Sequence, residues 1–277
     1  MKNKRIVVIG GAGFIGSHLC EELKNNNDVI SVDNYFTGSE KNHVSNVEYI
    51  KSDAKNVDEV VTGNVDIVYH LGEYSRVEQS FEDFNIVMDY NTATLYKVLE
   101  FAKKRGAKLI YSGSSTKFSQ EGRDSSPYAW SKATNTELVN NYSKWFGLDY
   151  AITYFYNVYG GREIKEGKYA TLIAKFKEMK KNGESLTIVK PGTQKRNFTH
   201  INDIVNGLII VGEKGNGDGY GIGYPKSYSI LEIAEMFDCD IKLIPERKGN
   251  RMESEVKIEK TLELGWIPTV NLRDYLK

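Results

Sequence analysis

The chain has 277 residues, of which 40% are hydrophobic and 12% aromatic, so it can bury one large core or two modest ones. Its 37 basic and 37 acidic residues balance, which argues against nucleic acid or an anionic membrane as a partner. Two cysteines, Cys20 and Cys239, are too few for a disulfide scaffold. The chain has no signal-peptide pattern and no apolar run near ~18 residues, so we expect a cytoplasmic protein that contacts no membrane.

Short β-branched runs alternate with helical patterns along the first part of the chain. Strands are predicted at 5–10, 28–33, 47–51, 66–71, 107–112 and 149–155, and helices at 14–25, 84–104 and 128–146. Apolar strands separated by helices are typical of parallel sheets with right-handed crossovers. The predicted fold class is therefore α/β, a Rossmann-type doubly wound parallel sheet.

The pattern changes after about residue 155. A helix is predicted at 169–182, a strand at 185–189, and helices near 201–213 and 229–237. We expect residues 1–155 to form the nucleotide-binding domain and residues 156–277 to form a smaller substrate-binding lobe. Part of this second half, within 185–227, is expected to return to the large domain.

A glycine-rich turn joins the first predicted strand to the first predicted helix. The sequence RIVVIG runs into GGAGFIG, and SHLCEELKN continues as a helix. Glycines let the backbone approach a pyrophosphate, and the start of a helix offers it free N–H groups. A tight turn without a ligand is the alternative, but the position of the turn favours a dinucleotide. The predicted cofactor contacts are Gly10, Gly13, Phe14, Ile15 and Gly16.

Carboxylates end the next two predicted strands. Asp33 follows the turn by about 20 residues, where a carboxylate accepts hydrogen bonds from the adenosine ribose hydroxyls and repels a 2′-phosphate. The predicted cofactor is therefore NAD rather than NADP. Asp53 is placed to reach the adenine, although an ordinary turn residue fits this position nearly as well. Asn34 and Ala54, which follow these carboxylates, complete this part of the predicted cofactor site.

Tyr128 and Lys132 are predicted to lie one turn apart on the same face of a helix. Ser-Ser-Pro precedes Tyr128 and provides a helix cap and a first turn, while Gly147 is a plausible end of the helix. A lysine ammonium beside a phenol favours the phenolate, which can remove a proton from a sugar hydroxyl. Both residues are also expected to contact the cofactor.

Hydroxyl side chains follow the strand predicted at 107–112. Open α/β sheets bind ligands at the carboxyl ends of their strands, which is where these side chains would lie. We expect Ser114 to share the substrate proton with Tyr128, and Ser115 and Thr116 to contact the substrate. A cluster of capping residues without any chemistry is the alternative reading of this segment.

These motifs together resemble the extended short-chain dehydrogenase/reductase family, and within it the NAD-dependent nucleotide-sugar epimerases and dehydratases, with the UDP-glucose 4-epimerases as the first members to compare. The resemblance covers nearly the whole chain. It rests on GGAGFIGSHL, VDNYFTGSE, VYHLGEYSRVEQS, FYNVYG, LTIVKPGTQKRNFTHINDIV, ERKGN and LGWIPTVNL.

The resemblance implies further contacts. Leu71 and Gly72 would lie beneath the nicotinamide, and Asn157 would contact the substrate. Arg196 and Arg247 would hold the substrate diphosphate, for which charge-assisted contacts are suited.

The sequence departs from the family pattern at several places, three of which bear on the site. Glu73 stands where a second small residue is usual, and it is either solvent-facing or a change in the pocket. Ser115 and Thr116 replace the acidic pair of the 4,6-dehydratases, which disfavours elimination of water. The segment between Ser114 and Tyr128 is shorter than the family's, which predicts a different substrate pocket.

The expected function is therefore NAD-dependent epimerisation of a nucleoside-diphosphate sugar, at C4 by the usual family chemistry. A nucleotide-sugar reductase or dehydrogenase is the main alternative, and an NAD-sensing binding protein is a third. No metal is expected, because no His, Cys, Asp or Glu group has ligand spacing. The resemblance also implies a homodimer that pairs the helices at 84–104 and 128–146. Residues that would line this interface, or instead be buried within one subunit, are Tyr90, Tyr96, Phe101, Tyr142 and Trp145.

Overall fold

The computed structural model describes residues 1–118, 123–245 and 256–277. Seven parallel strands form its main sheet, in the order β11-β6-β5-β4-β1-β2-β3, which confirms the predicted fold class. These strands are β1 (Arg5–Ile9), β2 (Asp28–Asp33), β3 (Glu48–Lys51), β4 (Ile67–His70), β5 (Lys108–Ser114), β6 (Tyr150–Phe155) and β11 (Gly217–Ile222).

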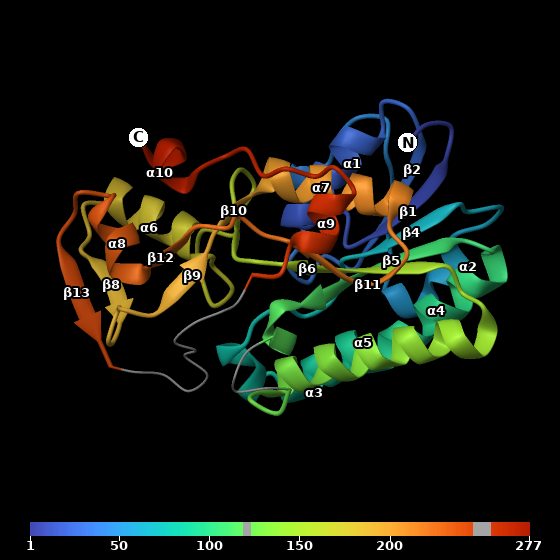
Figure 1. Ribbon diagram of the computed structural model, residues 1–277, viewed down its shortest axis with the longest axis horizontal. Coiled ribbons are helices and arrows are strands. Elements are labelled where there is room, and N and C mark those ends of the chain that lie inside the picture. The colour runs from blue at the N-terminus through green and yellow to red at the C-terminus, as the bar shows by residue number, and fades with distance from the viewer. Residues whose placement is uncertain (119–122, 246–255) are drawn as a thin grey trace.

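Helices cover both faces of this sheet (Figure 1). Along β1, Val7 and Ile9 pack into one core cluster while Ile6 and Val8 pack into another, because alternate side chains of a strand point to opposite faces. One face is covered by α1 (Phe14–Leu23) and α7 (Ile201–Lys214), and the other by α2 (Val57–Val60), α4 (Thr94–Arg105) and α5 (Pro127–Phe146). Short helical turns are η1 (Glu40–Asn42), η2 (Ala54–Asn56), η3 (Glu78–Phe81) and η5 (Ser115–Phe118).

The helix predicted at 84–104 is divided into three parts. It begins as α3 (Phe84–Val87), continues as the π-helix η4 (Met88–Ala93) and ends as α4. The Thr94 hydroxyl donates to the carbonyl of Asp89, 3.0 Å away. The Asn91 carbonyl accepts a hydrogen bond from the Asn135 side chain at 3.0 Å. The predicted helical stretch is therefore confirmed, and its wider π turn leaves a backbone acceptor for α5.

The predicted cap residues of α5 are confirmed. The Ser126 hydroxyl accepts a hydrogen bond from the Ala129 N–H at 3.1 Å, and Pro127 is the first helical residue. Gly147 ends the helix in the left-handed conformation, with φ of 72°. Tyr128 is consequently fixed in the first turn of α5, at the carboxyl edge of the sheet.

A third core cluster belongs to a smaller lobe beside the main sheet, on the left in Figure 1. It contains α6 (Leu172–Lys181), α8 (Ile230–Glu235), β8 (Leu186–Val189), β9 (Lys195–Asn197), β12 (Ser227–Ser229) and β13 (Ile241–Ile244). The remaining short elements are β7 (Val158–Tyr159), β10 (Thr199–His200), α9 (Glu259–Glu263) and α10 (Leu272–Leu276). Between 185 and 227, the chain returns to the main sheet through α7 and β11. None of the helices in the described ranges has the length and apolar character needed to cross a bilayer.

The C-terminal segment is tied to α7 by Asp203. Its buried carboxylate accepts hydrogen bonds from the N–H of Thr269 at 3.0 Å, the Thr269 hydroxyl at 2.8 Å and the N–H of Val270 at 3.0 Å. The Asp203 carbonyl also accepts from the Trp266 indole at 2.9 Å. One side chain therefore anchors the segment that crosses from the main sheet to the smaller lobe.

Asp203→Ala is expected to lower the free energy of unfolding by roughly 3 kcal/mol, because it leaves buried donors without an acceptor. Urea unfolding followed by circular dichroism measures this change. Asp274→Ala is the matched control, since the Asp274 side chain is 70% exposed and forms a surface ion pair with Lys277. An equal loss of stability in both variants would contradict the role given to Asp203.

Candidate active site

A cavity of about 480 Å³ lies at the carboxyl ends of the main-sheet strands, between the sheet and the smaller lobe. The smaller-lobe side is formed by residues 169–173 and Phe198. All predicted cofactor and catalytic residues line this cavity: Gly10, Gly13, Phe14, Ile15, Gly16, Asp33, Asn34, Asp53, Ala54, Leu71, Gly72, Ser114, Tyr128 and Lys132. The structure thus brings the glycine turn and the Tyr–Lys pair to one place.

Two glycines of the first turn allow close backbone contacts. Gly10 has φ of 83°, and a Cβ there would lie 2.8 Å from the backbone of Gly72. At Gly16, a Cβ would lie 2.1 Å from the Gly10 carbonyl oxygen. The residue that precedes α1 is Gly13, which provides no side-chain cap, so the first N–H groups of the helix can bind a phosphate.

Asp33 is held at the adjacent strand end by backbone donors. Its Oδ2 accepts from the Ala12 N–H at 2.9 Å and its Oδ1 accepts from the Tyr35 N–H at 2.8 Å. Burial raises the pKa of this carboxyl group, and the two N–H groups oppose that shift. Each oxygen retains a lone pair, as ribose hydroxyls require.

Asp53 has a local structural role as well as a place in the cavity wall. Its Oδ1 accepts from the Lys55 N–H at 2.9 Å and thereby caps the η2 turn. Oδ1 of Asp53 therefore acts as in an ordinary turn residue, which was the alternative to a cofactor contact. The contact with adenine stays a prediction.

The three predicted catalytic residues are arranged around the end of β5. Ser114 Oγ accepts hydrogen bonds from the Thr116 N–H at 3.2 Å and the Thr116 hydroxyl at 2.9 Å. Within the described residues, no side chain or backbone group is hydrogen-bonded to the Tyr128 hydroxyl, which leaves that group available to a substrate. Lys132 is buried and donates from Nζ to the carbonyl of Ser112 and to the carboxylate of Glu73.

Glu73 is a buried member of the site rather than a solvent-facing residue. Its side chain is 2% exposed and forms an ion pair with Lys132. The carboxylate also accepts from the Tyr111 hydroxyl at 2.9 Å and from Asn135 Nδ2 at 3.0 Å. Burial is the largest influence on the pKa of Glu73 and would raise it, but Lys132 and His70, whose Nε2 lies 3.4 Å from Oε1, together hold the pKa below its ordinary value of 4.5.

The hydrogen-bond network around Glu73 was not predicted from the sequence. Asn135 connects Glu73 to the π-helix by donating to the Asn91 carbonyl. Asn91 in turn accepts from the Tyr74 N–H at 2.7 Å and donates to the Ser131 hydroxyl at 3.0 Å. The spacing of Lys132 and Asn135 on one face of α5 was the available signal, but nothing local identified their partner.

The predicted substrate contacts divide into three groups. Ser115, Thr116 and Asn157 line the cavity, and Asn157 Nδ2 donates to the Asn197 carbonyl at 2.8 Å. Arg196 lies on β9 and is not among the lining residues. Arg247 lies outside the described residues. Binding of the substrate by these residues stays a prediction.

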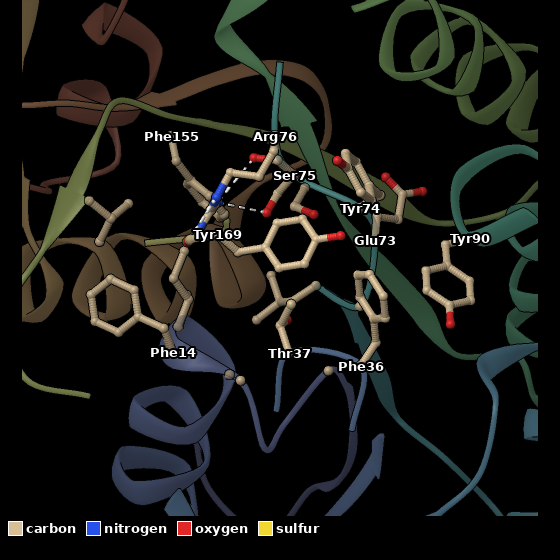
Figure 2. Close-up of a pocket in the computed structure, with 18 of the residues that line it drawn as sticks. Phe14, Phe36, Thr37, Glu73, Tyr74, Ser75, Arg76, Tyr90, Phe155 and Tyr169 are labelled. Carbon is tan, nitrogen blue, oxygen red and sulfur yellow. Dashed lines mark hydrogen bonds between the residues drawn. The ribbon is translucent and has the colours of Figure 1, made fainter. Parts of the chain in front are cut away.

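Several residues that line the cavity were not predicted from the sequence, and two of them come from opposite parts of the fold. Arg76 and Tyr169 meet across it, as Figure 2 shows, because the Arg76 guanidinium donates to the Tyr169 carbonyl. The side chains of Glu73 and Arg76 come from the same segment but point to opposite sides of it (Figure 2).

Comparisons with known proteins agree with this geometry. The model of the NAD-dependent epimerase/dehydratase family matches residues 6–223. UDP-glucuronic acid decarboxylase 6 of Arabidopsis thaliana is 32% identical over 306 residues, covering 99% of this chain and 87% of that protein.

Two solved structures are similar along almost their whole length. The UDP-N-acetylglucosamine 4-epimerase from Methanobrevibacter ruminantium M1, in complex with UDP-N-acetylmuramic acid, has a TM-score of 0.92 and 28% identity, covering 100% of this chain and 96% of that one. The UDP-glucuronic acid 4-epimerase from Bacillus cereus, in complex with UDP-glucuronic acid and NAD, has a TM-score of 0.87 and 26% identity, covering 98% and 96%. The predicted cofactor, NAD, is confirmed by these matches, and the turn at Gly10–Gly16 and Asp33 fit it.

Glu73→Gln is expected to lower the free energy of unfolding at neutral pH by roughly 3 kcal/mol, because it leaves the buried Lys132 charge without its partner. Since the pKa of Glu73 is lowered in the folded state, its stabilisation is complete above the unfolded pKa of 4.5 and is lost as pH falls through the folded value. The difference between wild type and variant should therefore be constant near neutral pH and shrink below pH 4.5.

Chemical denaturation at a series of pH values measures this difference. Asp58→Asn is the control, because Asp58 pairs with Lys104 and Arg105 on the surface and should contribute less than about 1 kcal/mol. If Glu73→Gln and wild type were equally stable at neutral pH, the ion pair would have no net stabilising effect.

Proposed function

The chain belongs to the NAD-dependent epimerase/dehydratase family, and we propose that it epimerises a nucleoside-diphosphate sugar at C4 of a hexose or related ring. The observation that carries this proposal is the position of Tyr128, Lys132 and Ser114 in the cavity that also contains the glycine turn and Asp33. A protein that only sensed NAD would not need a phenol and a hydroxyl at this position.

The chain's own residues would act on the proton of the sugar hydroxyl. NAD, when bound, supplies the redox chemistry by accepting a hydride from the sugar and returning it. Tyr128 would take the hydroxyl proton as the carbon is oxidised and give it back after the 4-keto sugar has rotated. Ser114 would hold the same oxygen by a hydrogen bond, and Thr116 positions the Ser114 hydroxyl. Lys132, fixed by Glu73 and the Ser112 carbonyl, would support the cofactor beside Tyr128.

Decarboxylation is the second candidate reaction. The relatives with at least 30% identity include UDP-glucuronic acid decarboxylases, and oxidation of a uronic acid at C4 produces a β-keto acid that can lose CO₂. Epimerisation and decarboxylation would thus share their first step and differ in the fate of the carboxylate. Net reduction or dehydrogenation is the third outcome to be measured.

One assay separates these reactions. Purified protein is incubated with UDP-, dTDP-, GDP- and CDP-sugars, both neutral and acidic, and the products are identified by NMR while NADH absorbance is recorded. We expect interconversion of two epimers without net NADH. A pentose with CO₂ would identify a decarboxylase, and stoichiometric NADH would identify a dehydrogenase.

Tyr128→Phe is expected to reduce turnover by at least about 100-fold, since loss of a general acid/base typically has an effect of this size. NAD affinity, measured by calorimetry, should change by less than about twofold. Tyr150→Phe is the control, because Tyr150 bonds to Asn140 outside the cavity. Activity of Tyr128→Phe within about tenfold of wild type would rule out Tyr128 as the base.

We also propose that the protein forms a homodimer through the outer surfaces of α4 and α5. Tyr96 and Trp145 support this, because their side chains are 49% and 63% exposed. Phe101 and Tyr142 are buried within the subunit, and Tyr90 packs against Phe36 with ring centroids 5.0 Å apart. Light scattering that gives the mass of one chain would contradict the dimer.

A further inference from the structure

Among the described residues, only uncharged groups hold Arg76 in the cavity. Its Nε and Nη2 donate to the Tyr169 carbonyl at 3.1 and 2.5 Å, and its Nη1 donates to the Ser75 carbonyl and hydroxyl, both at 3.1 Å. These contacts orient the guanidinium between two loops (Figure 2). They leave one N–H of Nη2 and the full positive charge unmatched in the part of the chain that the structure describes.

Four other arginines within the described residues, Arg5, Arg105, Arg123 and Arg162, have carboxylate partners. Arg105 pairs with Asp58 at 3.0 Å, and Arg162 pairs with Glu21 at 2.6 Å. No carboxylate within the described residues lies at ion-pair distance from Arg76. Burial lowers the pKa of Arg76, and only phenol groups, led by Tyr128, act in the opposite direction. A guanidinium nevertheless stays charged in proteins, so this charge calls for an anion that the described residues do not supply.

The other charges that line the cavity already have assignments. Glu73 and Lys132 neutralise each other. Asp33 and Asp53 lie at the ends of β2 and β3, on the adenosine side. Arg76 is therefore the single unbalanced cation among the described lining residues. Tyr128 and Tyr169 are its neighbours, so its charge acts at the catalytic end rather than at the adenosine end.

We propose that Arg76 binds a carboxylate carried by the sugar ring, which makes nucleoside-diphosphate uronic acids the substrate class. This inference rests on the proposed function, because it requires a nucleotide sugar in the cavity. A guanidinium suits a carboxylate better than an ammonium does, since its planar N–H groups match the two oxygens. The diphosphates of NAD and of the substrate are the other anions that could meet Arg76, and the experiment separates them.

The experiment measures binding by calorimetry to the NAD-loaded protein. The ligands are a uronic acid, the matching neutral hexose and the free nucleotide, each in the UDP and dTDP series. We expect wild type to bind the uronic acid roughly 10- to 100-fold more tightly than the neutral hexose, the range of a charged hydrogen-bonded contact. Arg76→Gln should reduce this ratio to about one and leave affinity for the neutral hexose and for NAD within about twofold.

Two further variants sharpen the result. Arg76→Lys should keep part of the preference, because it keeps the charge and loses the planar fork. Arg123→Gln removes an exposed arginine outside the cavity and should keep the full preference.

Equal affinity of wild type for the uronic acid and the neutral hexose would overturn the inference and leave the proposed function intact. Equal weakening of all three ligands by Arg76→Gln would assign Arg76 to the substrate diphosphate, and a loss of NAD affinity would assign it to the dinucleotide. Both results overturn the proposal. Failure of every nucleotide ligand to bind wild type would overturn the proposed function as well.

Discussion

The buried ion pair between Glu73 and Lys132 fixes the geometry of the whole site. Glu73 follows β4, Lys132 and Asn135 lie on α5, and Tyr111 belongs to β5, so one carboxylate joins three elements. Through Asn135 the network also reaches Asn91 in the π-helix. Removal of Glu73 would leave the buried Lys132 ammonium without its carboxylate, and removal of Lys132 would leave the buried Glu73 carboxylate beside His70, whose Nε2 lies 3.4 Å away. This mutual dependence holds Lys132 in one place and sets the distance between α5 and the sheet.

The same pair changes what Lys132 can contribute electrostatically. An isolated ammonium beside Tyr128 would favour the phenolate, as the Tyr–Lys spacing suggested. With Glu73 at hydrogen-bonding distance, the pair carries no net charge, so its effect on Tyr128 is that of a dipole and is correspondingly weaker. Lys132 is then better described as a positioning residue. Arg76, whose charge interacts with Tyr128, becomes the principal cation at this end of the cavity.

Local patterns were sufficient to predict most of the main sheet. The β-branched runs of β1, β2 and β6, the glycine turn and the Ser126–Pro127 start of α5 each depend on neighbouring residues. The strand β11 could not be predicted, because its glycines are set by contacts with a distant segment. At Gly221, a Cβ would lie 1.7 Å from the Lys257 carbonyl oxygen, so only glycine fits there. Glycine content normally argues against a strand, and here packing overrides that preference.

The site was less predictable than the sheet for a related reason. Tyr128, Lys132 and Ser114 could be found because their spacing on α5 and β5 is local. The role of Glu73 depends on Lys132, which is 59 positions away in sequence, and that of Arg76 depends on Tyr169, 93 positions away. A charge in a sequence does not show whether its partner is water, another side chain or a ligand. Contacts across the fold decide this, and they assign Glu73 to Lys132 while leaving Arg76 for a ligand.

The charge on Arg76 also bears on the choice between the two candidate reactions. Loss of CO₂ from a 4-keto uronic acid removes the negative charge of the carboxylate as the bond to the ring breaks. A guanidinium bound to that carboxylate stabilises the charged form and gains nothing as the charge moves onto the C4 keto oxygen, so the contact raises the barrier to decarboxylation. Tyr128, at the other end of the same keto acid, acts equally in both reactions. In a site arranged in this way, rotation and reduction of the intact keto acid are favoured over loss of its carboxylate.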